Sequence, residues 1–590
     1  MVRSKLRSAT TLVFLVFCAC VLIGLSLVFL RNTTPHQDSS EISEPNLDQL
    51  RSLPYLNQVE IDPNEDLTYG VTRFDPQRAF NGLNVYLCET FSAAPILSMN
   101  GEVVHVLVDL RENASRGWRL VEPYLPQDFL VLVEDQAIFR IDWQSNVQWE
   151  TRGRFHHDMS VAENGDIYTV TNRKTTFAPF TEKYAILDNE LVILSPEGKE
   201  TKALSFARMI ARDPVLLEAV RNDDIKETRY DAGVWDAMHT NTIEIIERDV
   251  VFAGQSLFEK GQVLFCMRQL DLVGVMDVDA AKIIWYWGPG ELDNPHQPSL
   301  LEDGHILIFD NGSRRGYSRV IEINPLTREI VDQYKADPPT SFFTNAKGSA
   351  ERLPNGNTVV CESERGRVFE LSPQKQIVWE FISWPLPNQH GKRTTLYRMP
   401  RLIDPQRYPV FDQTSATAHH RMGVGLVIVG RPDEGVSHLH QAVGLDPDHA
   451  PAHHDLGAAL DQRGQLDQAA NHFRHCLRIK PDADTHNRLA RILQVQGRTD
   501  QALDHFRKAA TLSPRWPVPL ASLARILATD PDPSRRDPVA AIQLAQRASA
   551  LAGGQNLAML DALAMAYAAA GRFDQAVPIA QSALDLAIAA

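Results

Sequence analysis

Apolar residues follow three successive patterns along the chain. Residues 9–30 carry no charged side chain, and as a helix they are long enough to cross the hydrocarbon core of a bilayer. Between residues 68 and 405, short apolar and aromatic runs alternate with Asn-Gly, Asp-Gly and Ser-Pro turns, which is typical of many β-strands. From residue 418 to 590, apolar positions recur at helical spacing. The pattern predicts a membrane anchor, an all-β domain and an all-α domain, in that order.

The N-terminal apolar segment is preceded by Arg3, Lys5 and Arg7. A cleaved secretory signal has a shorter apolar region and a small-residue cleavage site, and no good site follows Leu30. We interpret residues 9–30 as a transmembrane signal anchor, residues 1–8 as a cytoplasmic tail and the polar residues 31–67 as a linker. Because the positive flank stays in the cytoplasm, we expect a single-pass membrane protein whose bulk is extracytoplasmic, periplasmic if bacterial.

Two sequence phrases repeat inside the β-rich region. In the first phrase, a strand that follows a turn carries an aromatic residue, at Trp149, Trp285, Tyr334 and Trp379. These residues are separated by 136, 49 and 45 positions, and 136 is close to three times 45. A turn glycine opens an apolar strand at Gly165, Gly304 and Gly356. A period of about 45 to 50 residues with strands indicates the blades of a β-propeller, six or seven in number, and we predict six. A helical pattern at 201–223 predicts an insertion over one face.

The C-terminal region has a period of 33 to 34 residues, marked by Gly430, Gly464 and Gly497 and by Pro447, Pro481 and Pro514. This region resembles the tetratricopeptide repeat, a helix-turn-helix unit that stacks into a solenoid. Residues 406–417 form a connector before it. A fourth repeat is interrupted at 529–538, and a last one keeps Gly571. Such stacks leave a concave groove, so we expect a protein partner here.

The amino-acid composition excludes several classes of function. A hydrophobic content of 44% and a charged content of 23% are those of a globular protein. The net charge of −15 argues against nucleic acid, which requires a concentrated positive surface. The 6 cysteines contain no CxxC pair, so they predict no redox or metal role, and nothing in the sequence calls for a cofactor.

Polar residues stand at the start or end of apolar strands in four segments of the β-rich region. They are His156 and His157, then His239 and Asn241, then Arg268, and then His296. At equivalent edges of successive blades, these side chains would converge near the central channel. A metal site would not tolerate the competing cation of Arg268, whereas a site for a tetrahedral anion requires an arginine, an amide and imidazoles. We therefore predict an anion site without a metal.

Four short segments then resemble a known family. HHD at 156–158, HTN at 239–241, MRQ at 267–269 and HQP at 296–298, the last followed by LEDG and FDNG, look like the active-site blocks of bacterial arylsulfate sulfotransferases in the same order. The resemblance covers about residues 68–402 and leaves out the repeats. It implies an enzyme that moves a sulfuryl group from an aryl sulfate ester to a phenol, without a nucleotide sulfate donor.

The resemblance also assigns roles. His296 matches the nucleophile that carries the sulfuryl group, while His239, Asn241 and Arg268 match the groups that bind its oxygens. One member of the pair at 156–157 matches the remaining histidine, with a slight preference for the first. These histidines and His239 are candidates for moving the phenol proton.

Two alternative functions stay open, an aryl sulfate hydrolase and a non-catalytic scaffold that binds partners. The segment with Asn311, Arg314 and Arg315 could line the substrate entrance, but we interpret it as a solvated turn. The 11 histidines of the repeat region, among them His449 and His453, are interpreted as solvated helix surface and not as a metal site.

Overall fold

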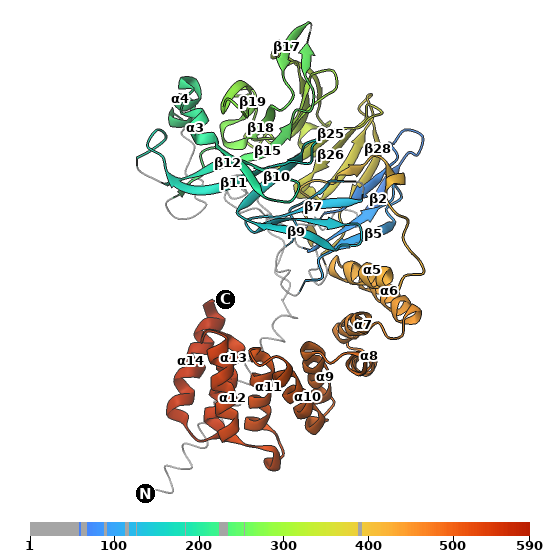
Figure 1. Ribbon diagram of the computed structural model, residues 1–590, viewed down its shortest axis with the longest axis vertical. Helices are drawn as coiled ribbons and strands as arrows, with labels where there is room; N and C mark the ends of the chain where they lie inside the picture. The colour runs from blue at the N-terminus through green and yellow to red at the C-terminus, as the bar shows by residue number, and fades with distance from the viewer. Residues whose placement is uncertain are drawn as a thin grey trace, which may run out of the picture. The chain divides into compact units, whose positions relative to one another are not determined.

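A computed structural model describes residues 58–60, 68–87, 91–111, 117–125, 127–182, 185–222, 234–252, 254–386 and 392–589 (Figure 1). The predicted cytoplasmic tail, the predicted anchor at 9–30 and most of the predicted linker lie outside these residues. Among the residues described, no helix combines the length and apolarity needed to cross a membrane. The predicted linker also contains a strand, β1 (Gln58–Glu60), which pairs with β29 (Lys392–Thr394).

Six antiparallel sheets follow one another along residues 70–402. The first three are β30 (Arg401–Leu402), β3 (Leu83–Val85), β4 (Ala93–Leu97) and β5 (Val103–Val108); β6 (Leu120–Pro123), β7 (Asp128–Val133), β8 (Ala137–Asp142) and β9 (Val147–Arg152); and β10 (Phe155–Val161), β11 (Ile167–Thr176), β12 (Ala185–Leu194) and β13 (Glu200–Ser205), with β14 (Val234–Trp235) beside β12.

The other three sheets are β15 (Thr240–Ile245), β18 (Val263–Met267), β19 (Leu272–Asp277) and β20 (Lys282–Trp287); β21 (Pro295–Leu300), β22 (Ile306–Asp310), β23 (Arg319–Ile323) and β24 (Ile330–Tyr334); and β25 (Ser349–Arg352), β26 (Thr358–Glu362), β27 (Arg367–Leu371) and β28 (Ile377–Ile382), with β2 (Gly70–Phe74) outermost. A separate hairpin joins β16 (Val250–Phe252) and β17 (Gln255–Phe258).

These six sheets are the blades of a β-propeller, as predicted. The late strand β30 completes the first blade and the early strand β2 completes the last, so the two ends of this region close the ring. The first strands β6, β10, β15, β21 and β25 contact one another in sequence and are therefore the innermost strands. Apolar side chains fill the space between neighbouring blades, for example Leu264 and Val273 of the fourth against Ile308 and Ile321 of the fifth.

The repeated aromatic residues lie on β9, β20, β24 and β28, the fourth strands of their blades. The interval of 136 residues spans two blades and not three, so that part of the prediction was wrong. The reason is the third blade, whose strands β11 and β12 have 10 residues each. That blade also carries α3 (Phe206–Ile210) and α4 (Pro214–Asn222), which confirm the predicted helical insertion (Figure 1).

The C-terminal region is all-helical, as predicted. Its helices are α5 (Ala416–Ile428), α6 (Pro432–Leu445), α7 (Ala450–Gln462), α8 (Leu466–Ile479), α9 (Ala483–Val495), α10 (Thr499–Leu512), α11 (Pro517–Thr529), α12 (Pro538–Leu551), α13 (Leu557–Ala569) and α14 (Phe573–Ala589). The glycine between the two helices of a repeat adopts a left-handed backbone, with φ of 73° at both Gly464 and Gly497. Helix α5 packs on the first blade, where Leu426 and Val429 share a core with Val106.

Candidate active site

Three consecutive blades present histidines in the same local structure. The innermost strand of each has a β-bulge near its start, between His156 and Met159 in β10, Thr240 and Thr242 in β15, and His296 and Ser299 in β21. Backbones with positive φ accompany the bulges, at His157 (57°), His239 (50°) and Gln297 (39°). Bulges redirect side chains, and strained backbones of this kind gather at functional sites. The fold thereby brings the predicted histidines to one region of the channel.

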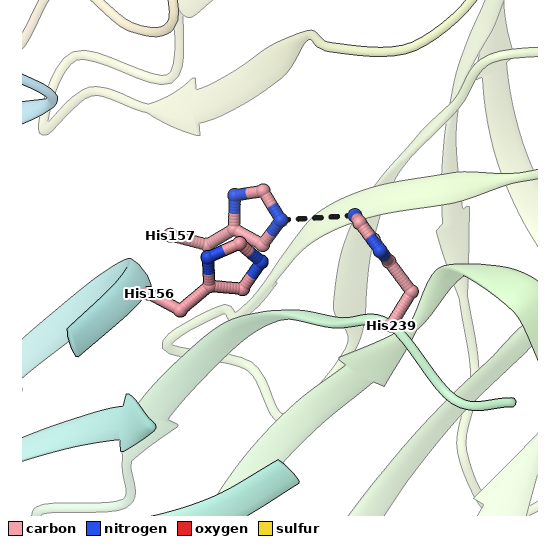
Figure 2. A group of neighbouring side chains, drawn as sticks. All are labelled: His156, His157 and His239. Atoms are coloured by element: carbon pink, nitrogen blue, oxygen red, sulfur yellow. Dashed lines mark hydrogen bonds between the residues drawn. The ribbon is translucent and has the colours of Figure 1, made fainter. Parts of the chain in front are cut away.

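A chain of hydrogen bonds links two of these histidines (Figure 2). Nε2 of His157 lies 2.9 Å from Nε2 of His239, and Nδ1 of His239 lies 2.5 Å from Oδ2 of Asp236. Nη2 of Arg119 donates to Nδ1 of His157 at 3.0 Å. Arginine only donates and carboxylate only accepts, so the direction is set: His157 donates through Nε2 to His239, which donates through Nδ1 to Asp236. Both imidazoles are neutral in this arrangement.

His156 has a different partner. Its Nδ1 lies 2.8 Å from Oε1 of Glu134, in ion-pair range although outside hydrogen-bond geometry. Burial raises the pKa of Glu134, but the charges of Arg119 and His156 outweigh burial and hold this pKa well below its usual value. The slight preference for His156 as the site histidine does not match this geometry, because His157 is the one bonded to His239.

His296 is held by the blade that carries it. Its Nδ1 lies 2.6 Å from Oδ1 of Asn311 and 3.2 Å from the carbonyl of Asn294. The amide nitrogen of Asn311 donates to the carbonyls of Thr344 (2.8 Å) and Lys347 (2.5 Å), which fixes the amide orientation. Both groups near Nδ1 are acceptors, so Nδ1 carries the proton and the lone pair is on Nε2.

Electrostatics keep this imidazole neutral. Burial, followed by the positive charge of Arg268, lowers the pKa of His296 to about 3. Burial also lowers the pKa of His239 against the opposing effect of Asp236. Burial holds the pKa of His157 well below its usual value, and the neighbouring imidazoles and Arg119 add to this effect. A neutral imidazole beside a permanent cation is suited to attack the central atom of a bound anion.

The remaining predicted residues lie on the same blades. Arg268 opens a short 3-10 turn between β18 and β19, and its backbone N–H donates to the carbonyl of His239 at 3.1 Å. The side chain of Asn241 is buried and donates to the carbonyl of Pro295 at 3.0 Å, one residue before His296. The site therefore joins the fourth blade to the fifth.

Several residues of the site went unrecognised in the sequence. Asn311 was interpreted as part of a solvated turn, and this was wrong: the side chain is fully buried because it bridges His296 to the next blade. Arg315 of the same segment pairs with buried Asp310 at 3.1 Å. Asp236 could have been suspected from its place three residues before His239. Arg119 carries no such signal, since it stands at the start of the neighbouring second blade, 38 residues before His157.

The three propeller histidines also lie close enough together to be considered as metal ligands. Nitrogen atoms of His156, His157 and His239 lie within 4.8 Å of one another, close enough for three ligands of one ion. In this structure the nitrogens that face each other form the hydrogen bond described above, and Arg119 adds a fixed positive charge 3.0 Å from His157.

The histidines of the repeat region are not all solvated, contrary to the prediction. His419, His420, His453 and His486 are buried, with side chains packed between the two helices of a repeat or against the next repeat. His449 caps α7 by accepting a hydrogen bond from the backbone of Ala452. The helical spacing was correct, but spacing does not show which face is covered by the neighbouring helix.

The fold and the site define a class: a six-bladed propeller with a buried cluster of histidines, joined to a helical solenoid. Residues 134–383 match the family described as Arylsulfotransferase (ASST). Residues 426–492, 483–516 and 559–589 match tetratricopeptide-repeat families, so the chain is a fusion of the two. No curated protein matches the sequence.

Among solved structures, the chain is similar to the MamA protein at 17% identity, covering 30% of this chain and 92% of that one with a TM-score of 0.27. It is also similar to a protein of unknown function from Bacteroides caccae at 10% identity. That match covers 51% of this chain and 93% of the other, with a TM-score of 0.35. A third similar structure is YrrB, a tetratricopeptide-repeat protein, at 16% identity. That match covers 30% of this chain and 88% of YrrB, with a TM-score of 0.27. Likenesses this weak do not bear on function.

Proposed function

We propose that this protein transfers a sulfuryl group from an aryl sulfate ester to a phenolic acceptor through a sulfohistidine at His296. The observation that carries the proposal is the hydrogen bond of 2.6 Å between Nδ1 of His296 and Asn311, which leaves the Nε2 lone pair as a nucleophile. The domain match is to a family of arylsulfotransferases, which supports the same class of reaction.

In the first step, Nε2 of His296 attacks sulfur, the bond from sulfur to the aryl oxygen breaks, and the aryl group leaves as the phenolate. In the second step, the acceptor phenol loses its proton and its oxygen attacks sulfur, which breaks the nitrogen–sulfur bond and restores the neutral imidazole. The sulfuryl group in flight spreads charge over its oxygens, and Arg268 and Asn241 would bind them. Two transfers through one covalent intermediate predict ping-pong kinetics.

His157 and His239 are placed to move the phenol proton. The two neutral rings are joined by a hydrogen bond, along which a proton can pass. Asp236 would stabilise the positive charge on His239 when that ring takes up a proton. His156, whose Nδ1 lies in ion-pair range of Glu134, would then hold the position of this pair and not touch substrate.

The cellular location and the partner of the protein are inferred from the regions on either side of the propeller. The charge-free segment at 9–30 after a basic flank supports a membrane anchor with the propeller outside the cytoplasm. The repeat solenoid supports recruitment of a protein partner through its concave face.

The test is to incubate the purified full chain with p-nitrophenyl sulfate, with and without added phenol. We expect acceptor-dependent release of nitrophenolate. His296→Ala should abolish release, and Arg268→Ala should lower it by about 100- to 1,000-fold. His305→Ala, which removes a histidine from a hairpin turn of the same blade, serves as the control and should leave turnover unchanged.

Three outcomes would contradict the proposal. Release independent of phenol would indicate a hydrolase that uses water. No release by the wild type with any aryl sulfate would favour a binding scaffold. Normal turnover by His296→Ala would remove the covalent mechanism.

A further inference from the structure

A carboxylate carried by the second blade reaches the two adjacent histidines of the third. Glu134 stands in the turn between β7 and β8, and its Oε1 lies 2.8 Å from Nδ1 of His156 and 3.5 Å from Nδ1 of His157. The other carboxylate oxygen, Oε2, lies 3.6 Å from Nε of Arg119. Glu134 therefore adjoins both the histidine pair and the arginine that donates to it.

Glu134 places a permanent negative charge at this point. The next residue of the turn, Asp135, donates its backbone N–H to the carbonyl of Phe155 at 2.9 Å, which holds the turn against β10. Burial alone would raise the pKa of Glu134, but Arg119 and His156 hold it well below its usual value. The carboxylate is therefore ionised at neutral pH.

Two arginines place positive charge on the same group of imidazoles. Arg119 donates to Nδ1 of His157 at 3.0 Å, and Arg268 adds to the effect of burial in lowering the pKa of His296. Glu134 offsets part of the positive charge of Arg119, because the two groups are 3.6 Å apart. A bound anion responds to each of these charges in proportion to its own charge. Glu134 thereby limits how much negative charge the site can hold.

Charge distinguishes an aryl sulfate from an aryl phosphate more than shape does. Both esters present a tetrahedral group with terminal oxygens. The sulfate ester carries one negative charge, whereas a phosphate monoester carries about 1.5 to 2 at pH 7, because its second pKa is about 6. A fixed negative side chain beside the site therefore repels the phosphate about twice as strongly as the sulfate.

We propose that Glu134 makes the site select a singly charged sulfate ester over the doubly charged phosphate ester of the same phenol. The inference rests on the proposed function, because it takes Nε2 of His296 as the place where the anion reacts. Glu134 acts by its charge across the ring of His157, whose other nitrogen faces His239, and does not touch the substrate. It is a specificity-determining residue of the site.

The experiment compares two ligands of similar shape that have no group to transfer, benzylsulfonate and benzylphosphonate. At pH 8.5 the sulfonate is a monoanion and the phosphonate a dianion. Calorimetric titration of the full chain should show tighter binding of the sulfonate. In Glu134→Gln, the affinity for the phosphonate relative to the sulfonate should rise by about tenfold or more, because the repulsion of the second charge is lost.

Two further variants separate charge from shape and from location. Glu134→Asp keeps the charge and should keep the preference of the wild type for the sulfonate. Glu163→Gln is the matched control, since this glutamate lies in an exposed turn of the third blade and pairs with Lys260. It should bind both ligands as the wild type does.

Each variant must keep the circular dichroism and Tm of the wild type for the comparison to count, and Glu134→Ala provides a second variant without the charge. An unchanged ratio of affinities in both uncharged variants would overturn the proposal. So would an equal rise in Glu134→Asp, or a wild type that prefers the phosphonate. The readout needs no turnover, so the two proposals fail separately: absence of transfer contradicts the proposed function, and an unchanged ratio contradicts the role of Glu134.

Discussion

At the scale of the residue, the tautomer of one imidazole decides what the site can do. His296 is nucleophilic only through a ring nitrogen that carries no proton, and the hydrogen bond to Asn311 places the proton on the other nitrogen. Two backbone carbonyls of the next blade hold the amide in the orientation that accepts this bond. With a pKa of about 3, the imidazole remains neutral through the whole physiological range.

Asn311→Ala should therefore slow aryl sulfate turnover without abolishing it. Loss of one hydrogen bond to an orienting partner costs about 1 to 3 kcal/mol, or roughly 5- to 150-fold in rate. Ser313→Ala is the matched control from the same loop. The Ser313 hydroxyl donates to the carbonyl of Asn345 and accepts from the side-chain amide of Asn294, and it does not contact the imidazole itself. Initial rates and Tm of both variants would be compared. Equal rates for the two would show that Asn311 does not position His296.

At the scale of the element, the junction of the two domains depends on a glycine. Helix α5 lies so close to β5 that a Cβ on Gly425 would come within 2.2 Å of Cγ1 of Val106. Leu426 and Val429 of this helix fill the same core. The first helix of the repeats is therefore also part of the packing of the first blade.

Gly425→Ala should destabilise the protein by about 1 to 3 kcal/mol, the usual cost of overpacking a core. Gly444→Ala in α6 is the control, because a Cβ there meets no atom within 4 Å. The helix propensity of alanine should make that change neutral or stabilising by up to about 1 kcal/mol. Urea unfolding of both variants measures the difference. A stable Gly425→Ala variant would mean that α5 does not pack on the blade in solution.

At the scale of the whole molecule, closing the ring gathers carboxylates in the channel. Glu122 of β6, Asp158 of β10 and Glu244 of β15 come from three blades, and Arg398 pairs with the first two, with Nη1 2.9 Å from Glu122. Burial, offset in part by Arg398, raises the pKa of Glu122 to about 7. Burial, offset in part by a backbone hydrogen bond from Leu300, raises the pKa of Glu244 to about 7.

These shifts predict a stability that depends on pH. A carboxyl with a folded pKa of about 7 and an ordinary value of 4.5 stabilises the fold below pH 4.5 and loses this contribution as pH rises through 7. Glu244→Gln keeps an acceptor for the backbone of Leu300 but cannot ionise. The variant should gain about 1 to 3 kcal/mol relative to wild type between pH 5 and pH 8, measured by urea unfolding at both values. A constant difference would mean that Glu244 is already solvated.

Sequence patterns predicted much of the fold because they reflect local rules. Turn glycines and strand aromatics recur with each blade, and the glycine and proline of each repeat follow from helix-turn-helix geometry. The number of blades could only be bounded, since the long strands and helices of the third blade break the period. His239, Asn241, Arg268 and His296 could be proposed because each stands at the end of an apolar strand.

The tertiary structure decided which side chains meet and in what protonation state. Arg119 reaches His157, and His157 reaches His239, because neighbouring blades pack side by side, and no local pattern records a contact across 38 or 82 residues. His157 is bonded to His239, and it has a positive φ at the bulge. In the same way, His453 is buried and His440 is exposed, although the sequence places both on helices. Local sequence thus fixed the elements and their order, while desolvation and long-range contacts, which exist only in the folded chain, fixed the chemistry.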